Sequence, residues 1–247
     1  MKRYFIELSF NGKAYHGWQI QQNARTVQAE LNQAISTLLQ ENINVIGCGR
    51  TDTGVHAKSF FAHFDSKYAV EKDFQYRLNT ILPSDIAVQS VQEMSETAHA
   101  RFSAVSRTYK YSIIQKKDPF NSDYAWLFTP KLNIGLMNKV SKTLLEFDDF
   151  SSFCKSNDQK HGNKCILYEA EWTQSDHWII FKIKANRFIR NMVRALTGTI
   201  LLVGLEKINS NEFIRIIESK DRKAAGKSLP AHGLCLIDVE YPVNIFL

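Results

Sequence analysis

The residues best suited to chemistry lie in the segment 47–57, whose sequence is GCGRTDTGVHA. It contains one carboxylate, Asp52, one guanidinium two residues earlier, Arg50, and three glycines. Side chains two residues apart in an extended loop point the same way, so Arg50 and Asp52 can share one face. A nearby cation keeps an aspartate ionised, which suits a nucleophile or a base. Local physics alone favours a simpler interpretation, a turn between two strands with a surface ion pair.

A second candidate lies on a strand predicted at about 107–115. Tyr109, Tyr111 and Ile113 alternate along it and share one face. The pattern alone favours a half-buried strand with aromatic packing. The functional alternative is a tyrosine that stacks on an extruded base, because every base has a π-face that a ring can cover.

A third candidate group is basic. Arg187, Arg190 and Arg194 are spaced i, i+3 and i+7 around the start of a helix predicted at about 188–203, which would place them on one face. The simpler interpretation is the solvated face of an amphipathic helix.

Longer sequence motifs around these residues favour the functional interpretations over the simpler ones. GRTDTGVHA at 49–57 resembles the signature of the tRNA pseudouridine synthase A family, although the family usually has Ala where this chain has Thr53. ARFSAVSRTYKY at 100–111 and NRFIRNMVR at 186–194 are similar to the family's second and third motifs. GWQIQ at 17–21 matches a further family loop, in which we expect Trp18 to serve packing. The resemblance extends from Gly17 to Tyr241.

The resemblance implies a role for each candidate residue. Asp52 would be the catalytic nucleophile, Arg194 its basic partner, and Tyr109 the residue that stacks on the base. A guanidinium suits the partner's task because it can grip a carboxylate with two hydrogen bonds. A base within a stem cannot react until it is flipped outward, at a cost of a few kcal/mol. We hypothesise that Arg50 fills the vacated space and contacts phosphate.

The activity that the resemblance implies is isomerisation of uridine to pseudouridine in the anticodon stem-loop of tRNA, at positions 38, 39 and 40, by a homodimer. An isomerisation needs no redox cofactor and no ATP, in keeping with the lack of a dinucleotide fingerprint or P-loop. Four cysteines without CxxC spacing give no argument for a metal or a disulfide framework. A non-catalytic RNA-binding module and a glycoside hydrolase are the rivals, but a hydrolase usually pairs two carboxylates.

Composition sets the class of partner and the compartment. The chain has 247 residues and a net charge of +6, which favours an anionic partner such as nucleic acid. No apolar run is long enough to span a bilayer and no signal peptide is evident, so we expect a cytoplasmic protein. The histidines are expected to be structural hydrogen-bonders, with His56 the one to check; they are residues 16, 56, 63, 99, 161, 177 and 232.

Hydrophobic periodicity predicts the same order of elements, β-α-β-β-α-β, in each half of the chain. The fold class is therefore α+β, with two ferredoxin-like (split βαβ) halves, 1–105 and 106–247, joined through a continuous, mostly antiparallel sheet. The resemblance implies the pseudouridine synthase fold. Strands are predicted at 2–10, 43–46, 59–64, 86–91, 107–115, 165–173, 178–185 and 233–241, and helices at 27–38, with Thr26 as N-cap, 73–80, 136–145, 188–203 and 212–218.

Overall fold

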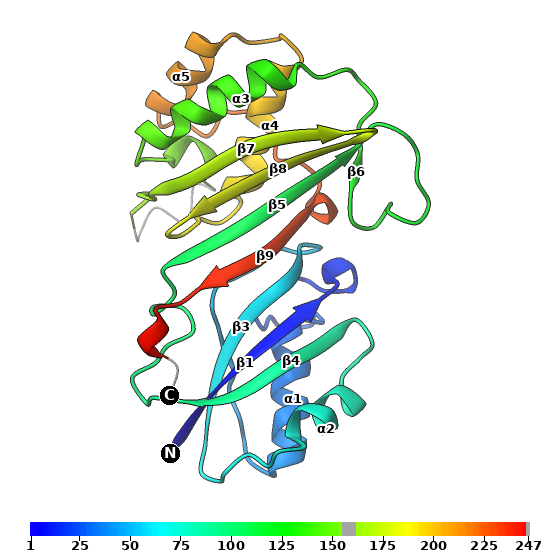
Figure 1. Ribbon diagram of the computed structural model, residues 1–247, viewed down its shortest axis with the longest axis vertical. Helices are drawn as coiled ribbons and strands as arrows, with labels where there is room; N and C mark the ends of the chain where they lie inside the picture. Colours follow the sequence, from blue (N-terminus) through cyan, green and yellow to red (C-terminus); the bar gives the residue numbers. More distant parts are fainter. Residues whose placement is uncertain (155–161, 246–247) are drawn as a thin grey trace. The chain divides into compact units, whose positions relative to one another are not determined.

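The computed structural model describes residues 1–154 and 162–245, and its contacts divide the chain into two compact units (Figure 1). The first unit contains Met1–Ser106 and Leu236–Leu247, and the second contains Arg107–Cys235. Most of the last strand therefore groups with the first unit, whereas sequence order would assign it to the second half. His161 lies outside the described residues.

The first unit is built on strands in the order β4-β1-β3-β9, and β1 is antiparallel to both β3 and β4. A short strand, β2, pairs with β3. Two helices cover one face of this sheet (Figure 1). The elements are β1 (Lys2–Phe10), α1 (Val27–Leu39), β2 (Ile46–Gly47), β3 (His56–Ser66), α2 (Phe74–Ile81), β4 (Ile86–Met94) and β9 (Leu234–Glu240).

The core of the first unit follows from the predicted patterns. Thr26 caps α1 by accepting a hydrogen bond from the backbone N–H of Ala29, as its residue type predicts. Leu31 and Ile35 from α1 are fully buried. Trp18 stacks on Phe60 of β3 with ring centroids 4.2 Å apart, which confirms its packing role.

The second unit has strands in the order β5-β8-β7, and all of these pairs are antiparallel. A two-residue strand, β6, runs parallel to the end of β5. The elements are β5 (Ser106–Ile114), β6 (Trp126–Leu127), α3 (Ile134–Thr143), β7 (Leu167–Ser175), β8 (Trp178–Ala185), α4 (Met192–Gly204) and α5 (Ser210–Glu218). Short 3-10 helices lie in both units: Gly12–Ala14 and Val243–Ile245 in the first, and Leu144–Glu146, Ser151–Phe153 and Ala231–Gly233 in the second.

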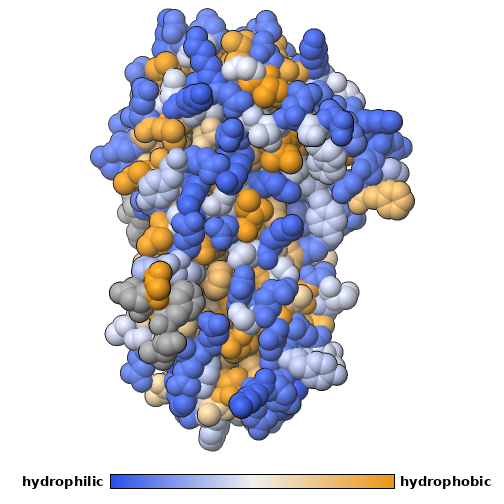
Figure 2. All heavy atoms as spheres, viewed as in Figure 1, coloured by the Kyte–Doolittle hydropathy of each residue, from blue (hydrophilic) through white to orange (hydrophobic). Residues whose placement is uncertain are grey.

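The core of the second unit joins its sheet to its helices. Trp172 of β7 stacks on Phe181 of β8 at 4.5 Å, and its indole N–H donates to Ser141 of α3 over 3.1 Å. Helix α4 is buried along nearly its whole length. Elsewhere, the face seen in Figure 2 is mainly hydrophilic, with apolar residues in small groups. None of the helices in residues 1–154 and 162–245 has the length and apolarity needed to cross a bilayer.

The predicted class is confirmed, since the chain is a mixed α+β protein with a large, mostly antiparallel sheet. Two local predictions are wrong. The apolar run 43–46 is mostly irregular, and only Ile46–Gly47 forms a strand there. Helix α4 begins at Met192 rather than at 188, because Asn191 has a left-handed backbone with φ 67° that a right-handed helix cannot include.

The late start of α4 changes the arrangement of its arginines. Arg187 and Arg190 precede the helix, and only Arg194 lies on it. The predicted single helical face of three arginines is therefore wrong.

Candidate active site

The loop that carries Asp52 is fixed at both of its ends within the first unit. On the entering side, β2 pairs with β3, and the backbone N–H of Cys48 donates to the carbonyl of Phe61 over 2.7 Å. On the leaving side, the N–H of Val55 donates to the carbonyl of Asp52 over 3.1 Å, which closes a tight turn. Gly54 within this turn has φ 78°, a conformation that glycine adopts without strain.

A second loop, residues 12–18, supports the Asp52 loop from the side. The N–H of Gly54 donates to the carbonyl of Tyr15 over 3.2 Å, and the N–H of Trp18 donates to the carbonyl of Thr51 over 3.3 Å. These two hydrogen bonds bracket Asp52. The first residues of the family-like GWQIQ segment, Gly17 and Trp18, therefore belong to the loop that supports the candidate nucleophile.

Tyr15 anchors this supporting loop. Its side chain is buried, and its hydroxyl donates to a carboxylate oxygen of Asp85. Burial, together with the hydrogen bond to Asp85, raises the pKa of the Tyr15 phenol well above its ordinary value, so the hydroxyl remains a donor. The guanidinium of Arg25 lies 4.8 Å from the centre of the same ring. The side chain of Tyr15 thus fixes the supporting loop, and its backbone carbonyl contacts the Asp52 loop at Gly54.

The side chains of the loop differ in their exposure. Arg50 is exposed, Asp52 is half-buried, and Thr51 between them is buried. The hydroxyl of Thr51 has no hydrogen-bond partner among residues 1–154 and 162–245. A buried hydroxyl is ordinarily paired, so an unpaired one beside the candidate nucleophile marks an unusual position.

The histidine next to this loop is structural, as predicted. His56 is buried at the start of β3, and its Nδ1 accepts a hydrogen bond from the backbone N–H of Gly12 over 3.0 Å. A side chain on Gly12 would collide with Val55, because an added Cβ would lie 2.0 Å from the carbonyl oxygen of Val55. His56 therefore holds the supporting loop against the end of the Asp52 loop.

In the second unit, the two tyrosines of β5 have different environments. Tyr111 is fully buried, and its hydroxyl donates to the carbonyl of Pro230 over 2.8 Å. Burial raises the pKa of Tyr111, an effect that nearby Arg194 partly offsets. Tyr109 is half-buried and meets the ring of Phe188 edge to face at 5.1 Å. The sequence singled out Tyr109 but not Phe188, which lies far along the chain within the third motif.

Arg194 lies in the first turn of α4 and is half-buried. Its Nε donates to the carbonyl of Leu229 over 2.7 Å, and the N–H of Leu229 donates back to the carbonyl of Arg194 over 3.2 Å. The next residue, Pro230, accepts from Tyr111. The segment 229–230 thus connects the arginine to the strand that carries Tyr109.

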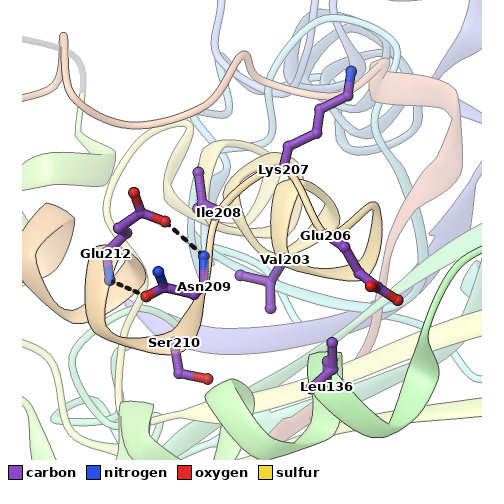
Figure 3. Close-up of a pocket in the computed structure, with 8 residues that line it drawn as sticks. All are labelled: Leu136, Val203, Glu206, Lys207, Ile208, Asn209, Ser210 and Glu212. Atoms are coloured by element: carbon purple, nitrogen blue, oxygen red, sulfur yellow. Dashed lines mark hydrogen bonds between the residues drawn. The ribbon is translucent and has the colours of Figure 1, made fainter.

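A pocket of about 310 Å³ lies elsewhere in the second unit (Figure 3). Asn209 and Glu212 in its wall form the capping box of α5, and Glu206 accepts from Asn133, so much of the polar wall is engaged in local structure. Its lining residues are Leu136, Val203, Glu206, Lys207, Ile208, Asn209, Ser210 and Glu212, and they include no predicted site residue. Within the described residues, no group of three or more His, Cys, Asp or Glu side chains could hold a metal ion.

Comparison with known proteins identifies the class of enzyme. A family model described as tRNA pseudouridine synthase matches residues 144–242. A tRNA pseudouridine synthase A from Parabacteroides distasonis is 44% identical, over 100% of this chain and 98% of that relative. A protein of the same name from Azobacteroides pseudotrichonymphae is 45% identical over 100% of this chain and 99% of that relative. Another from Bacillus subtilis is 38% identical over 95% of this chain and 97% of that relative. The protein is thus an isomerase of the pseudouridine synthase class. The chain belongs to the tRNA pseudouridine synthase A family.

Proposed function

We propose that this protein isomerises uridine to pseudouridine in the anticodon stem-loop of tRNA, at positions 38, 39 and 40, with Asp52 as the nucleophile. The observation that carries the proposal is the half-buried Asp52 on a loop held at both ends, in a chain similar over its whole length to tRNA pseudouridine synthases A. The net charge of +6 also favours an anionic partner.

The reaction breaks the N1–C1′ bond of uridine, turns the base and forms a C5–C1′ bond. The proton on C5 is lost to water, and N1 gains a proton, so the nucleoside keeps its composition and no cofactor is consumed. An ionised carboxylate suits each available route: attack at C1′, attack at C6, or removal of the 2′ proton to give a glycal. In each route Asp52 acts as an anion kept from bulk water, and Arg194 orients its carboxylate.

The target uridine must leave its stack before it can react, which costs a few kcal/mol. The exposed side chain of Arg50 is suited to fill the vacated space and to contact phosphate. Tyr109 is suited to hold the flipped uracil, because its ring is only half-buried and is braced by Phe188 from the edge.

The test follows tritium in a tRNA transcript labelled at C5 of its uridines. We expect wild-type protein to release tritium into water while the RNA chains stay intact, and Asp52→Asn to release none above background. Thr53→Ala, which introduces the residue usual in the family at an exposed neighbour, is the matched control and is expected to retain activity. Equal release by Asp52→Asn would refute the assigned nucleophile.

The same assay separates the rival functions. Release of free uracil would indicate a glycoside hydrolase, and RNA binding without tritium release would indicate a non-catalytic RNA-binding module. Transcripts in which single uridines at positions 38, 39 or 40 are replaced by cytidine test the site of action. Tritium release that is unchanged when all three are replaced would refute the anticodon assignment.

Arg50 has a test of its own. If it holds the flipped state, Arg50→Ala is expected to lower turnover more than it lowers affinity for tRNA, because binding of the unflipped RNA remains. Arg50→Lys, which keeps the charge but not the planar group, separates the contact to phosphate from the filling of space. Equal losses of turnover and affinity in Arg50→Ala would contradict the flipping role.

We further propose that the enzyme acts as a cytoplasmic homodimer. Sedimentation at the working concentration tests the oligomeric state, and a monomer would remove that part of the proposal. Binding to tRNA is expected to weaken steeply with salt, because Lys and Arg side chains that contact phosphates release counterions.

A further inference from the structure

The ring of Phe102 stands at the surface of the first unit, on the segment 95–105 that connects β4 to β5. It is 76% exposed, although apolar side chains gain free energy by leaving water. The guanidinium carbon of Arg101 lies 5.6 Å from the ring centre, and the imidazole of His99 lies 4.4 Å away at an interplanar angle of 39°. Phe102 is thus an open ring with a cation and a second aromatic group beside it.

A closed turn fixes the backbone that carries this ring. The Nδ1 of His99 accepts hydrogen bonds from the N–H groups of Arg101 and Phe102, over 3.1 and 3.3 Å. The N–H of His99 donates to the hydroxyl of Ser103 over 3.0 Å, and the N–H of Ser103 donates back to the carbonyl of His99 over 2.9 Å. The backbone that carries the exposed ring is therefore held in place before any partner arrives.

The turn is also anchored to the sheet beneath it. His99 packs edge-on against buried His63 of β3 at 4.6 Å, and the N–H of Ala100 donates to Nδ1 of His63 over 3.1 Å. The hydroxyl of Tyr241 donates to the carbonyl of Ala100 over 2.6 Å. In addition, Arg3 of β1 donates to the carbonyl of Ala98 over 2.8 Å. Strands β1 and β3, together with the residue that follows β9, thus secure the turn that carries this ring.

The same stretch of β3 supports the Asp52 loop. Ile46 of β2 is paired with His63, and Cys48 donates to Phe61 two residues before it. The stem of the Asp52 loop and the base of the Phe102 turn therefore rest on neighbouring residues of one strand.

We propose that Phe102, flanked by Arg101, is a stacking platform for an unpaired base of the RNA substrate other than the reacting uracil. This proposal rests on the proposed function only in taking RNA as the substrate. An aromatic face accepts any base, and an adjacent guanidinium adds attraction to the base or to its phosphate.

A protein partner fits this surface less well. Stable protein interfaces bury about 800 Å² on each partner and are centred on a contiguous apolar patch. Here one ring stands between Arg101, which is exposed, and the polar Ser103. A single preordered ring with a cation is enough for a base.

The test is equilibrium binding of an unmodified tRNA transcript to the full-length protein. Phe102→Ala is expected to raise the dissociation constant roughly 5- to 150-fold, the range that loss of one stacked base implies. Phe102→Trp keeps a π-face and is expected to bind within about twofold of wild type. The matched control is Phe120→Ala, which removes a ring that is 90% exposed in the second unit, and it is expected to leave binding unchanged.

Salt dependence and stability add two further readouts. The salt dependence of binding reflects the counterions that phosphate contacts release, and stacking of a base on a ring releases none. Phe102→Ala should therefore keep the wild-type slope of log affinity against log salt. Phe102→Leu keeps an apolar side chain without a π-face, so it should fold like wild type and still bind weakly. The melting temperature of each variant identifies a variant that fails to fold.

Three outcomes would overturn the platform. Wild-type binding by Phe102→Ala or by Phe102→Leu would do so. Weakened binding by Phe102→Trp to the same extent as by Phe102→Ala would show that the π-face is not what matters. A change in oligomeric state on sedimentation of Phe102→Ala would assign the ring to contact with a second copy. Because binding is measured rather than turnover, a result against Asp52 as nucleophile leaves this test intact.

Discussion

Gly17 and Thr51 are in direct backbone contact, since a Cβ atom added to Gly17 would lie 2.3 Å from the carbonyl oxygen of Thr51. Gly17 also has φ +87°, which side-chain-bearing residues rarely adopt. The two residues belong to loops that are separated in sequence by helix α1. The position of the Asp52 loop therefore depends on a residue that carries no chemistry.

Gly17→Ala is expected to displace the Asp52 loop. The added methyl group must move a backbone carbonyl and also adopt a strained φ, so we expect the free energy of unfolding to fall by about 1–3 kcal/mol. Turnover is expected to fall more than tenfold, because small displacements of a catalytic group cost large factors in rate. Chemical denaturation and the tritium-release assay measure the two effects.

Gly49→Ala is the matched control for this prediction. Gly49 lies in the same signature as Asp52, but a Cβ there would have nothing within 4 Å, and its φ is not in the left-handed region. We expect wild-type stability and activity from this variant. Equal damage by both substitutions would mean that the loop tolerates no added methyl group, and would argue against the contact between Gly17 and Thr51 as the cause.

Thr51→Val is expected to leave stability unchanged or to raise it by about 1 kcal/mol. Thr51 is 8% exposed as a residue, and its buried hydroxyl lacks a partner among residues 1–154 and 162–245, so folding desolvates that hydroxyl without compensation. Valine has the same shape without the polar atom, and removal of an unsatisfied group is neutral or stabilising. A loss of more than 1 kcal/mol by chemical denaturation would show that the hydroxyl is hydrogen-bonded in solution.

Much of the fold could be predicted from local sequence, because alternation and helical periodicity reflect which face each element buries. The strand at Lys2–Phe10 and the helix capped by Thr26 are clear examples. The start of α4 could not be predicted in this way. The residues from Phe188 onward continue a helical pattern, and only the left-handed backbone of Asn191 interrupts it. Asparagine tolerates that conformation but does not require it.

For the candidate site, the sequence predicted only residues that lie within the motifs. The string around Asp52 marks the loop, but its supports come from distant parts of the chain. Tyr15 and Gly17 contact the loop although helix α1 separates them from it in the sequence. Phe188 contacts Tyr109 although most of the sequence of the second unit lies between them. Such contacts depend on how strands and helices pack. Neither residue type nor spacing reveals them in one sequence.

The left-handed turn before α4 gives a prediction about Asn191. Its side-chain amide donates to the hydroxyl of Ser228 over 2.7 Å, while its φ of 67° favours glycine. Asn191→Gly and Asn191→Ala both lose the amide, but only alanine is strained there. We therefore expect the alanine variant to be less stable than the glycine variant by about 1 kcal/mol in chemical denaturation. Equal stabilities would show that the turn relaxes, which would let α4 begin earlier.

Buried His63 gives a prediction about pH. Its pKa is lowered to about 4, chiefly by burial and also by the positive charge of Arg3 and by His99, while Asp65 acts in the opposite direction. In the unfolded chain an ordinary histidine titrates near 6.5. Between these two values the unfolded state binds a proton that the folded state excludes. Stability from the neutral imidazole is therefore complete above about pH 6.5 and is lost as the pH falls toward 4.

We expect this effect to lower the free energy of unfolding by on the order of 2 kcal/mol between pH 6.5 and 4.5. His63→Gln does not titrate in this range, and its amide oxygen is an acceptor that can replace Nδ1 for the N–H of Ala100. Denaturation curves across this range should show a smaller decline for the variant than for wild type. His99 also has a lowered pKa and remains in both proteins. Because its charge lowers the pKa of His63, the difference between the two proteins includes the coupling between these two histidines. Parallel declines would mean that His63 is protonated in the folded protein without cost, and that its surroundings are more hydrated than its burial implies.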